Sequence, residues 1–167
     1  MFPMNRLAAR LLILHPEHHQ LLVVTRKHEL SRLCFPGGKT EPHETLEEGL
    51  VRETLEETGL VVPVETLVPI HMGVVRNDVA HDPHLYEVHT FYAPWHPTYL
   101  YPSQQEARVI PQWVSPQDYL SHCMDRDHDQ QVWEAFEAFV VKQKQDPQQT
   151  QIQTGTTLLN GGSPFGN

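Results

Sequence analysis

The stretch GKTEPHETLEEGLVRETLEETGL, residues 38–60, combines the start and stop signals of a helix with regularly spaced carboxylates. Thr45, followed three residues later by Glu48, forms a capping-box pattern in which each side chain accepts a hydrogen bond from the other residue's backbone N–H. Gly59 suits the left-handed conformation that ends many helices. We therefore expect a helix from Thr45 to Thr58.

Three glutamates of this helix, Glu53, Glu56 and Glu57, fall within an arc of roughly 100° when the helix turns by about 100° per residue. Neighbouring like charges destabilise a helix, so the row predicts a positive group among them. A hard divalent cation, which prefers oxygen ligands, is the natural candidate. Arg52 stands four residues from both Glu48 and Glu56 and can hold a carboxylate with its planar guanidinium.

The apolar residues of the helix predict its surroundings. Leu46 and Leu50 lie beside the carboxylates, whereas Val51 and Leu55 lie on the far side, so we expect the helix to be covered on both sides. Gly49 costs up to about 1 kcal/mol relative to alanine in mid-helix. It either allows a loop or ligand to approach closely or is a tolerated small residue, and both interpretations stay open.

Rows of glutamates are commonly solvated helix faces, but the spacing here fits the pattern G-x5-E-x7-R-E-U-x-E-E-x-G-U, where U is aliphatic. The seven fixed positions are Gly38, Glu44, Arg52, Glu53, Glu56, Glu57 and Gly59. At average residue usage, a chance match in a chain of this length is on the order of one in a million. The stretch resembles the Nudix box of the Nudix hydrolases and covers 23 of 167 residues. It departs from the pattern at Thr54, where an aliphatic residue is usual.

The resemblance implies an α/β fold of the Nudix type, an α/β/α sandwich with a mixed sheet. It also implies cleavage of a nucleoside diphosphate linked to another group, with Mg²⁺ or Mn²⁺ as cofactor. The metal-binding residues would be Glu53, Glu56, Glu57 and Gly38. Glu44 would orient Arg52 or reach a metal through water, and Arg52 would brace the carboxylates. Because substrate and site are both anionic, bridging cations are needed to bring them together and to activate a water.

Glu106, just before the segment ARVIPQWVSPQDYL, is a candidate general base or additional metal ligand. In members of the resembled family, an acidic residue ahead of a Trp-containing strand often lies over the metal site. The alternative is a surface glutamate. The expected catalytic residues are Arg52, Glu53, Glu56, Glu57 and Glu106.

The segments Thr25-Arg26-Lys27 and Phe35-Pro36-Gly37-Gly38-Lys39 resemble the MutT-type branch, whose members hydrolyse nucleoside triphosphates to a monophosphate and pyrophosphate. The substrate-binding residues would be Arg26, Lys27, Lys39, Gly37 and Gly38, with surface charges near a turn as the alternative. The base would contact an aromatic side chain such as Phe35, Tyr92 or Trp113. ADP-ribose, a nucleotide sugar or a dinucleoside polyphosphate are alternative substrates. A silent nucleotide-sensing module is the rival class, and the complete set of box glutamates disfavours it.

The charge composition of the chain restricts the kinds of molecule that it is expected to bind. The net charge is −9 and no basic block occurs, so we expect a small nucleotide as partner, with no nucleic acid polymer and no membrane. Two cysteines, Cys34 and Cys123, favour a reducing cytoplasm. The apolar run from Leu7 to Leu14 is interrupted by Arg10 and is too short to span a bilayer. Oligomeric state stays open.

We expect one domain over residues 1–144 and a disordered Gln/Thr/Gly-rich tail over 145–167. Helical spacing of apolar residues predicts a second long helix over Gln130–Lys144, after a short helix that begins near Pro116. The histidines of HDPHLYEVH match no standard zinc spacing and are expected to be solvated loop residues. The predicted strands and extended segments are Arg6–Leu14, Gln20–Thr25, Leu60–Ile70, His71–Val75, Leu85–Tyr92 and Ala107–Val114.

Overall fold

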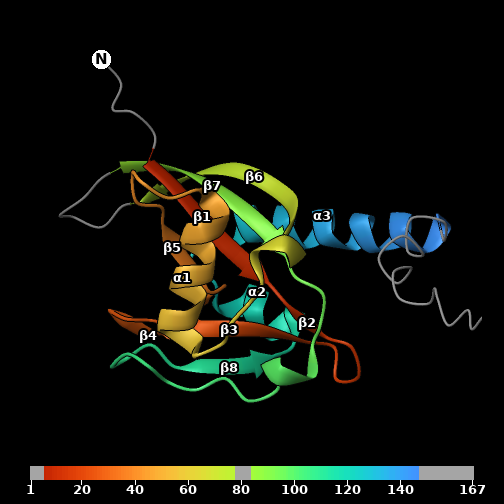
Figure 1. The fold of residues 1–167 in the computed structure, drawn as a ribbon, viewed down its shortest axis with the longest axis horizontal. Coiled ribbons are helices and arrows are strands. Elements are labelled where there is room, and N and C mark those ends of the chain that lie inside the picture. The colour runs from red at the N-terminus through yellow and green to blue at the C-terminus, as the bar shows by residue number, and fades with distance from the viewer. Residues whose placement is uncertain (1–5, 78–83, 147–167) are drawn as a thin grey trace, which may run out of the picture.

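Two four-stranded sheets lie at the centre of the computed structural model, which describes residues 6–77 and 84–146 (Figure 1). The first sheet has the strand order β5-β1-β7-β6. Its strands β1 and β7 are parallel and the other neighbours are antiparallel, so the sheet is mixed. Its strands are β1 (Arg6–Leu12), β5 (Gly37–Lys39), β6 (Val68–Asn77) and β7 (His84–Tyr92).

The second sheet has β3 at its centre, paired with β2, β4 and β8. Its strands are β2 (Leu14–His15), β3 (Gln20–Arg26), β4 (Glu29–Cys34) and β8 (Pro111–Val114). The helices are α1 (Leu46–Thr58), α2 (Pro116–His122) and α3 (Arg126–Gln145), with short 3₁₀ turns at Val64–Thr66 and Pro97–Tyr99. No helix of the described residues has the length and apolar character needed to cross a membrane.

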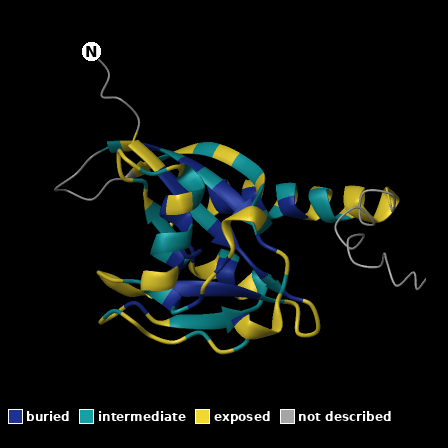
Figure 2. Cartoon of the chain, viewed as in Figure 1, coloured by how far each residue is buried: buried dark blue, intermediate teal, exposed yellow. Residues whose placement is uncertain are grey.

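Alternate residues of β1 face different helices. Ala9 and Leu11 belong to the same buried cluster as Leu50 of α1, whereas Leu12 belongs to the cluster that contains Val132 of α3. Because successive side chains of a strand point to opposite faces, α1 and α3 cover opposite faces of the first sheet. The buried residues run along the strands between the helices (Figure 2). The predicted α/β/α sandwich with a mixed sheet is therefore confirmed.

Two strands were not predicted. The six residues of β4 show no alternation of apolar and polar side chains, and the first four are exposed. The three residues of β5 are Gly-Gly-Lys, which have low strand propensity. Their backbone pairs with residues 8–10 of β1. β4 forms a hairpin with the strand before it, β3, whereas β5 forms because the distant strand β1 offers hydrogen-bond partners that local sequence patterns do not reveal.

The second long helix begins earlier than predicted, at Arg126 instead of Gln130. The first turn of this helix is polar, so it lacks the helical spacing of apolar residues by which the remaining turns were predicted. Asp125 is the N-cap, with Oδ1 accepting the backbone N–H of His128 at 3.0 Å. Of the predicted tail, residues 147–167 lie outside the described part of the chain.

One face of α1 is buried and the opposite face is open, so the predicted cover on both sides is wrong. The buried residues are Gly49, Leu50, Thr54 and Thr58, whereas Leu55 is 45% exposed. The buried face packs onto β1 and β5. The helix therefore presents its carboxylates along the border between the packed face and solvent.

Thr54 lies on this buried face with no exposed surface, and its hydroxyl has no hydrogen-bond partner. A buried hydroxyl without a partner is destabilising. We expect Thr54→Val to raise the free energy of unfolding by about 1 kcal/mol, measured by urea denaturation. Thr58→Val is the matched control and should lower stability, since the Thr58 hydroxyl donates to the Thr54 carbonyl at 2.6 Å. A loss of stability in Thr54→Val would contradict this account.

Candidate functional site

The caps of α1 form as predicted. The Thr45 hydroxyl accepts the Glu48 backbone N–H at 3.1 Å, and the Glu48 carboxylate accepts the Thr45 backbone N–H at 2.9 Å. Gly59 ends the helix with φ 72°, in the left-handed region. Because its carboxylate is used in the cap, Glu48 does not bind Arg52, and the expected pair between them is not formed.

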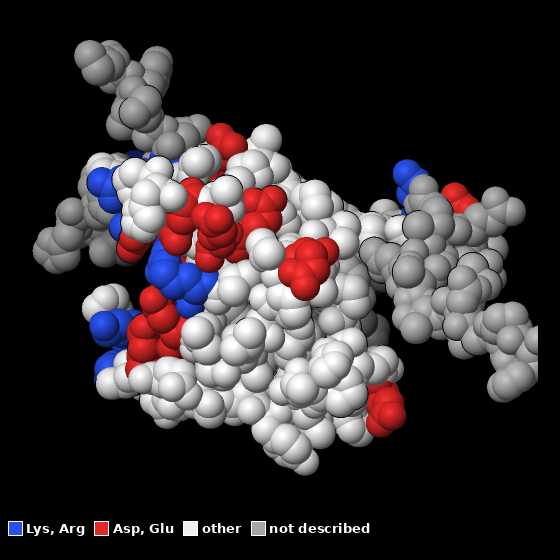
Figure 3. Space-filling view, viewed as in Figure 1, with Lys and Arg blue, Asp and Glu red and all other residues white. Residues whose placement is uncertain are grey.

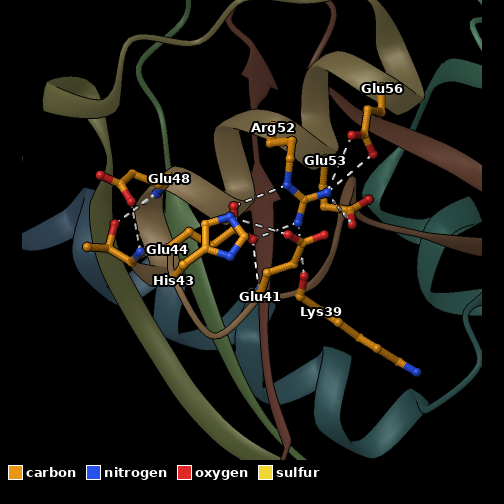
Figure 4. A network of polar contacts seen from close by, with 9 residues as sticks. Lys39, Glu41, His43, Glu44, Glu48, Arg52, Glu53 and Glu56 are labelled. Carbon is orange, nitrogen blue, oxygen red and sulfur yellow. Dashed lines mark hydrogen bonds and ion pairs between the residues drawn. The ribbon is translucent and has the colours of Figure 1, made fainter.

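Arg52 instead joins the loop before the helix to the carboxylates on it (Figure 4). Its Nε and Nη2 donate to the two oxygens of Glu44 at 3.1 and 2.7 Å. Its Nη1 donates to Glu53 at 3.0 Å and to Glu56 at 3.4 Å. Hydrogen bonds from Arg52 lower the pKa of Glu44 to about 2. Glu44 thus orients Arg52, which is one of the two roles that the family resemblance implied.

Three glycines let these carboxylates approach the backbone. The Gly37 N–H donates to Glu57 Oε1 at 2.8 Å. A Cβ at Gly38 would lie 2.7 Å from the carboxyl carbon of Glu53, and one at Gly49 would lie 2.8 Å from an oxygen of Glu44. Of the two interpretations of Gly49, close approach is therefore the one that the structure supports.

The buried carboxylates favour a cation between them. Burial raises the pKa of Glu57 to about 8, with the charges of Glu53 and Glu106 adding to the effect and the Gly37 N–H opposing it. Burial also raises the pKa of Glu53, against the hydrogen bond from Arg52. Acidic side chains gather over α1, next to basic ones (Figure 3). A divalent cation at this place would remove the cost of ionising these groups.

The donors fit a hard cation in chemistry, because all are carboxylate or carbonyl oxygens of Glu53, Glu56, Glu57 and Gly38. Their present arrangement is not a closed cage: within residues 6–77 and 84–146, no three His, Cys, Asp or Glu side chains are placed to hold an ion. Arg52 lies between Glu53 and Glu56 and satisfies part of their charge. Binding a cation therefore requires the contacts of Nη1 to give way, while the paired bonds to Glu44 can stay.

Binding of a cation should be coupled to loss of a proton. Burial raises the pKa of Glu57 to about 8, so a cation that bound this carboxyl would have to displace a proton from it near neutral pH. We expect Mg²⁺ affinity to rise with pH up to about 8 and then level off, with proton release near pH 7. Calorimetric titrations in buffers of different ionisation enthalpy would measure this release.

The raised pKa of Glu57 also makes the free energy of unfolding depend on pH. A carboxyl whose pKa is higher in the folded chain favours folding in its protonated form, so metal-free protein should lose stability as pH rises from about 4.5 to about 8. Glu57→Gln is the control, because it cannot ionise and should remove both the proton release and this part of the pH dependence. Proton release of the same size in Glu57→Gln would show that another group is responsible.

A cavity of about 540 Å³ adjoins the acidic site across β5. Four of the predicted substrate-binding residues line it, namely Arg26, Gly37, Gly38 and Lys39. Lys27 is exposed and is not among the lining residues. Of the candidate base contacts, Phe35 lines the cavity, whereas Tyr92 packs on Phe136 and the Trp113 indole donates to the Leu100 carbonyl.

Glu106 reaches the acidic site from a separate loop. It forms an isolated bridge with Val109 shortly before β8, and its charge raises the pKa of both Glu53 and Glu57. The structure therefore brings this glutamate into electrostatic range of the α1 carboxylates. Its role in catalysis stays a prediction.

Sequence reasoning missed two cations of the cavity, Arg10 and Arg76. Arg10 had a signal that was interpreted only as a break in an apolar run: a lone charge within a buried strand requires a partner or a ligand. Arg76 follows a run that reads as strand and carries no local signal. The cavity also contains Cys34, whose pKa is raised to about 11 by burial, so its thiol is not activated.

The histidines expected in a loop are partly in a strand. His84 and His89 belong to β7, and the His89 ring lies 2.7 Å from the Glu87 carboxylate. His81 lies outside the described residues. The correction concerns the secondary structure of His84 and His89.

Comparison with known proteins agrees with this geometry. The family model of the NUDIX domain matches residues 4–139. The chain is 38% identical to the ADP-ribose pyrophosphatase of Methanocaldococcus jannaschii over 65 residues, 38% of each chain. It is 36% identical to the oxidized purine nucleoside triphosphate hydrolase of Mus musculus over 110 residues, 65% of each chain. The matched region thus spans less than two thirds of both relatives.

A solved structure shows the same fold. The NUDIX domain of Shewanella oneidensis NrtR, in a cocrystal with ADP ribose, superposes with a TM-score of 0.61. The match covers 83% of this chain and 90% of that chain at 21% identity. At this identity the likeness establishes architecture alone.

Proposed function

Because this chain belongs to the Nudix family, we propose that it is a pyrophosphohydrolase that uses Mg²⁺, or Mn²⁺ in its place, to cleave a phosphoric anhydride bond of a nucleotide. The observation that carries the proposal is the arrangement around Arg52. One guanidinium contacts Glu44, Glu53 and Glu56, while Glu57 is fixed by the Gly37 N–H. A carboxylate row of this kind, with a cationic cavity beside it, suits a metal-assisted reaction of a polyphosphate.

The most favoured substrate is a ribo- or deoxyribonucleoside triphosphate, cleaved to a monophosphate and pyrophosphate. A bound divalent cation would neutralise phosphate charge and make a water more acidic. Water attacks one phosphorus of the anhydride, the bridging P–O bond breaks, and pyrophosphate leaves. Glu57 and Glu106 are the carboxylates that could take the proton of the attacking water. Arg26 and Lys39 would bind phosphate oxygens from the cavity side.

The relatives support two substrate classes, since one is named for ADP-ribose and the other for oxidized purine nucleoside triphosphates. The longer match is to the triphosphate hydrolase. A panel of nucleoside triphosphates, ADP-ribose, a nucleotide sugar and a dinucleoside polyphosphate, assayed with Mg²⁺, would separate them. We expect a triphosphate to give the highest kcat/KM, with monophosphate and pyrophosphate as products. Tight binding of a nucleotide without any turnover would instead favour a sensing module.

Glu106 can be tested by itself. If it transfers a proton, Glu106→Gln should lower kcat at least tenfold with little change in KM. Glu65→Gln, at an exposed glutamate of a 3₁₀ turn, is the control and should leave both constants unchanged. Wild-type kcat in Glu106→Gln would remove Glu106 from the mechanism and leave Glu57 as the base.

A further inference from the structure

Glu106 is the first residue of a tight turn whose backbone conformation is unusual for its sequence. The turn runs from Glu106 to Val109, and the Val109 N–H donates to the Glu106 carbonyl at 3.3 Å. Its third residue, Arg108, has φ 67°, in the left-handed region where such turns usually have glycine or asparagine. This conformation is unfavourable for a residue with a side chain and persists only where surrounding contacts hold it. Other parts of the chain must therefore fix this turn.

The Thr25 side chain, near the end of β3, supplies the central contacts to the turn. Its hydroxyl donates to the Arg108 carbonyl at 2.8 Å and accepts the Ile110 N–H at 2.9 Å. The Thr25 N–H also donates to the Ile110 carbonyl at 3.1 Å. Both Thr25 and Val109, which lies between the two bonded residues, are buried. One hydroxyl therefore holds the backbone on both sides of Val109.

A second contact from the same region holds the Arg108 side chain. Its Nε donates at 2.9 Å to the carbonyl of Lys27, the residue that follows β3. Arg108 is thus bound through its carbonyl by Thr25 and through its guanidinium by Lys27. Together these contacts explain how a residue with a side chain keeps the left-handed conformation that the turn requires.

The segment before the turn is tied to the C-terminal end of α1. The Ser103 N–H donates to the Thr58 carbonyl at 2.8 Å, and the Gln105 side-chain amide donates to the Ser103 hydroxyl at 2.7 Å. A Cβ at Gly59 would lie 2.5 Å from the Ser103 Oγ and 2.9 Å from the Gln105 Nε2. Glycine at the helix C-cap therefore lets this segment lie directly on the helix that carries the acidic site.

The turn is fixed between α1 and β3, with Glu106 at its start. In addition to the effect of burial, the charge of Glu106 raises the pKa of both Glu53 and Glu57, so its carboxylate lies within electrostatic range of theirs. The Glu106 carbonyl accepts the Gln104 side-chain amide at 3.0 Å. Within residues 6–77 and 84–146, no group donates a hydrogen bond to the Glu106 carboxylate itself. Its location is therefore set by the backbone of the turn.

We propose that Thr25 is a positioning residue for the hydrolysis, because its hydroxyl holds the turn that keeps the Glu106 carboxylate beside α1. This inference rests on the proposed function, in which Glu106 is one of two carboxylates that could take the proton of the attacking water. Thr25 itself contacts neither substrate nor water in this role. Its loss should act on kcat more than on KM, since a displaced base slows proton transfer but leaves the phosphate contacts in place.

The first test removes the hydroxyl and keeps the shape of the side chain. Thr25→Val should lower kcat about tenfold for the best nucleotide of the panel and change KM by less than about twofold. Thr25→Ser keeps the hydroxyl and should retain kcat within about threefold of the wild type. Thr66→Val is the matched control, because the Thr66 hydroxyl also donates to a backbone carbonyl, at 2.7 Å, but in the 3₁₀ turn Val64–Thr66. It should leave both constants unchanged.

A double-mutant cycle separates positioning of Glu106 from a general loosening of the fold. If Thr25 acts through Glu106, adding Thr25→Val to Glu106→Gln should lower kcat further by less than about twofold. A tenfold loss in both backgrounds would overturn the proposal. Wild-type kcat in Glu106→Gln would also overturn it, because the turn would then carry no group for the reaction.

Amide hydrogen exchange tests the anchor without turnover. In Thr25→Val, the Val109 and Ile110 amides should exchange at least about tenfold faster than in the wild type, whereas in Thr25→Ser they should stay near wild-type rates. Arg108→Met removes the other side-chain anchor at an exposed residue and gives a second reading if Thr25→Val does not fold. It should speed exchange of the Val109 amide at least about threefold and lower kcat only where Glu106 is present.

The outcomes separate the two proposals. Unchanged exchange in both Thr25→Val and Arg108→Met would overturn the anchoring of the turn. Faster exchange with wild-type kcat in both variants would overturn the positioning role and leave the hydrolysis standing. If the wild type turned over no nucleotide of the panel, the proposed function and the role of Thr25 in it would both be overturned, while exchange would still decide whether Thr25 holds the turn.

Discussion

Glu56→Gln is expected to lower kcat/KM by on the order of 100-fold while the protein stays folded. The Glu56 side chain is 45% exposed, and its contact with Arg52 is long at 3.4 Å, so its loss removes little packing or hydrogen bonding. Glutamine keeps the shape but lacks the charge that a hard cation requires. The measurement is steady-state kinetics on the best nucleotide of the panel, with Mg²⁺ titrated for each variant.

Glu47→Gln is the matched control, because it makes the same change of charge on the first turn of the same helix. It should retain wild-type kinetics within about twofold. Higher Mg²⁺ should recover part of the activity of Glu56→Gln if weakened metal binding is the cause. Equal losses in both variants would mean that the general negative charge of α1 matters and that Glu56 has no specific role.

Gly37→Ala is expected to cost about 3 kcal/mol or more of unfolding free energy and to remove activity. Gly37 has φ 145°, which is strained for any residue with a side chain. A Cβ there would overlap the Ala9 carbonyl oxygen and lie 2.9 Å from the Arg10 Cα. These are backbone atoms of the central strand β1, so they cannot move aside. The pairing of β5 with β1 should therefore break, which also moves the Gly37 N–H away from Glu57.

Gly49→Ala is the control for a glycine that meets a side chain instead of backbone. The added Cβ would lie 2.8 Å from a Glu44 oxygen, which is the far end of a side chain and not a backbone atom. Higher helix propensity offsets part of the strain, so stability should change by less than about 1 kcal/mol. Both variants are compared by urea denaturation and kinetics. Stability of Gly37→Ala within 1 kcal/mol of the wild type would contradict the close approach of β5.

We expect Arg52 to have different partners in the metal-free and the metal-bound site. With no cation, its guanidinium bridges Glu44, Glu53 and Glu56, so the metal-free helix is not left with unopposed charge. A cation that binds Glu53 and Glu56 would compete with Nη1 alone, because the bonds from Nε and Nη2 to Glu44 are on the other side of the fork. The same arginine would thus stabilise the metal-free helix and stay anchored to Glu44 when a cation binds.

Several features could be predicted because they depend on neighbours within about five residues. The capping box, the left-handed Gly59 and the carboxylate arc are local consequences of helix geometry, and the Nudix resemblance turned them into an expected fold. Glu48 shows the limit of such reasoning. Its spacing from Arg52 allowed an ion pair, but the helix N-terminus offered an unpaired backbone N–H and took the carboxylate first.

The cavity illustrates what depends on distant contacts. Arg10, Arg26, Lys39 and Arg76 come from four strands, and Asp129, which holds Arg10, comes from α3. No spacing along the chain relates them, since strand pairing across dozens of residues decides which side chains share a face. Lys27, next to Arg26, was expected in the same role but is exposed outside the cavity.

From its amino acids alone, this protein is specified as a capped helix with a row of carboxylates within a layered α/β domain, because capping and helical periodicity act over a few residues. Only the tertiary structure decided that Arg52 is anchored by Glu44, that β5 brings two glycines against Glu53 and Glu57, and that cations from four strands line one cavity. These arrangements depend on backbone pairing between β1 and its neighbours, and on the close approach that glycine permits there.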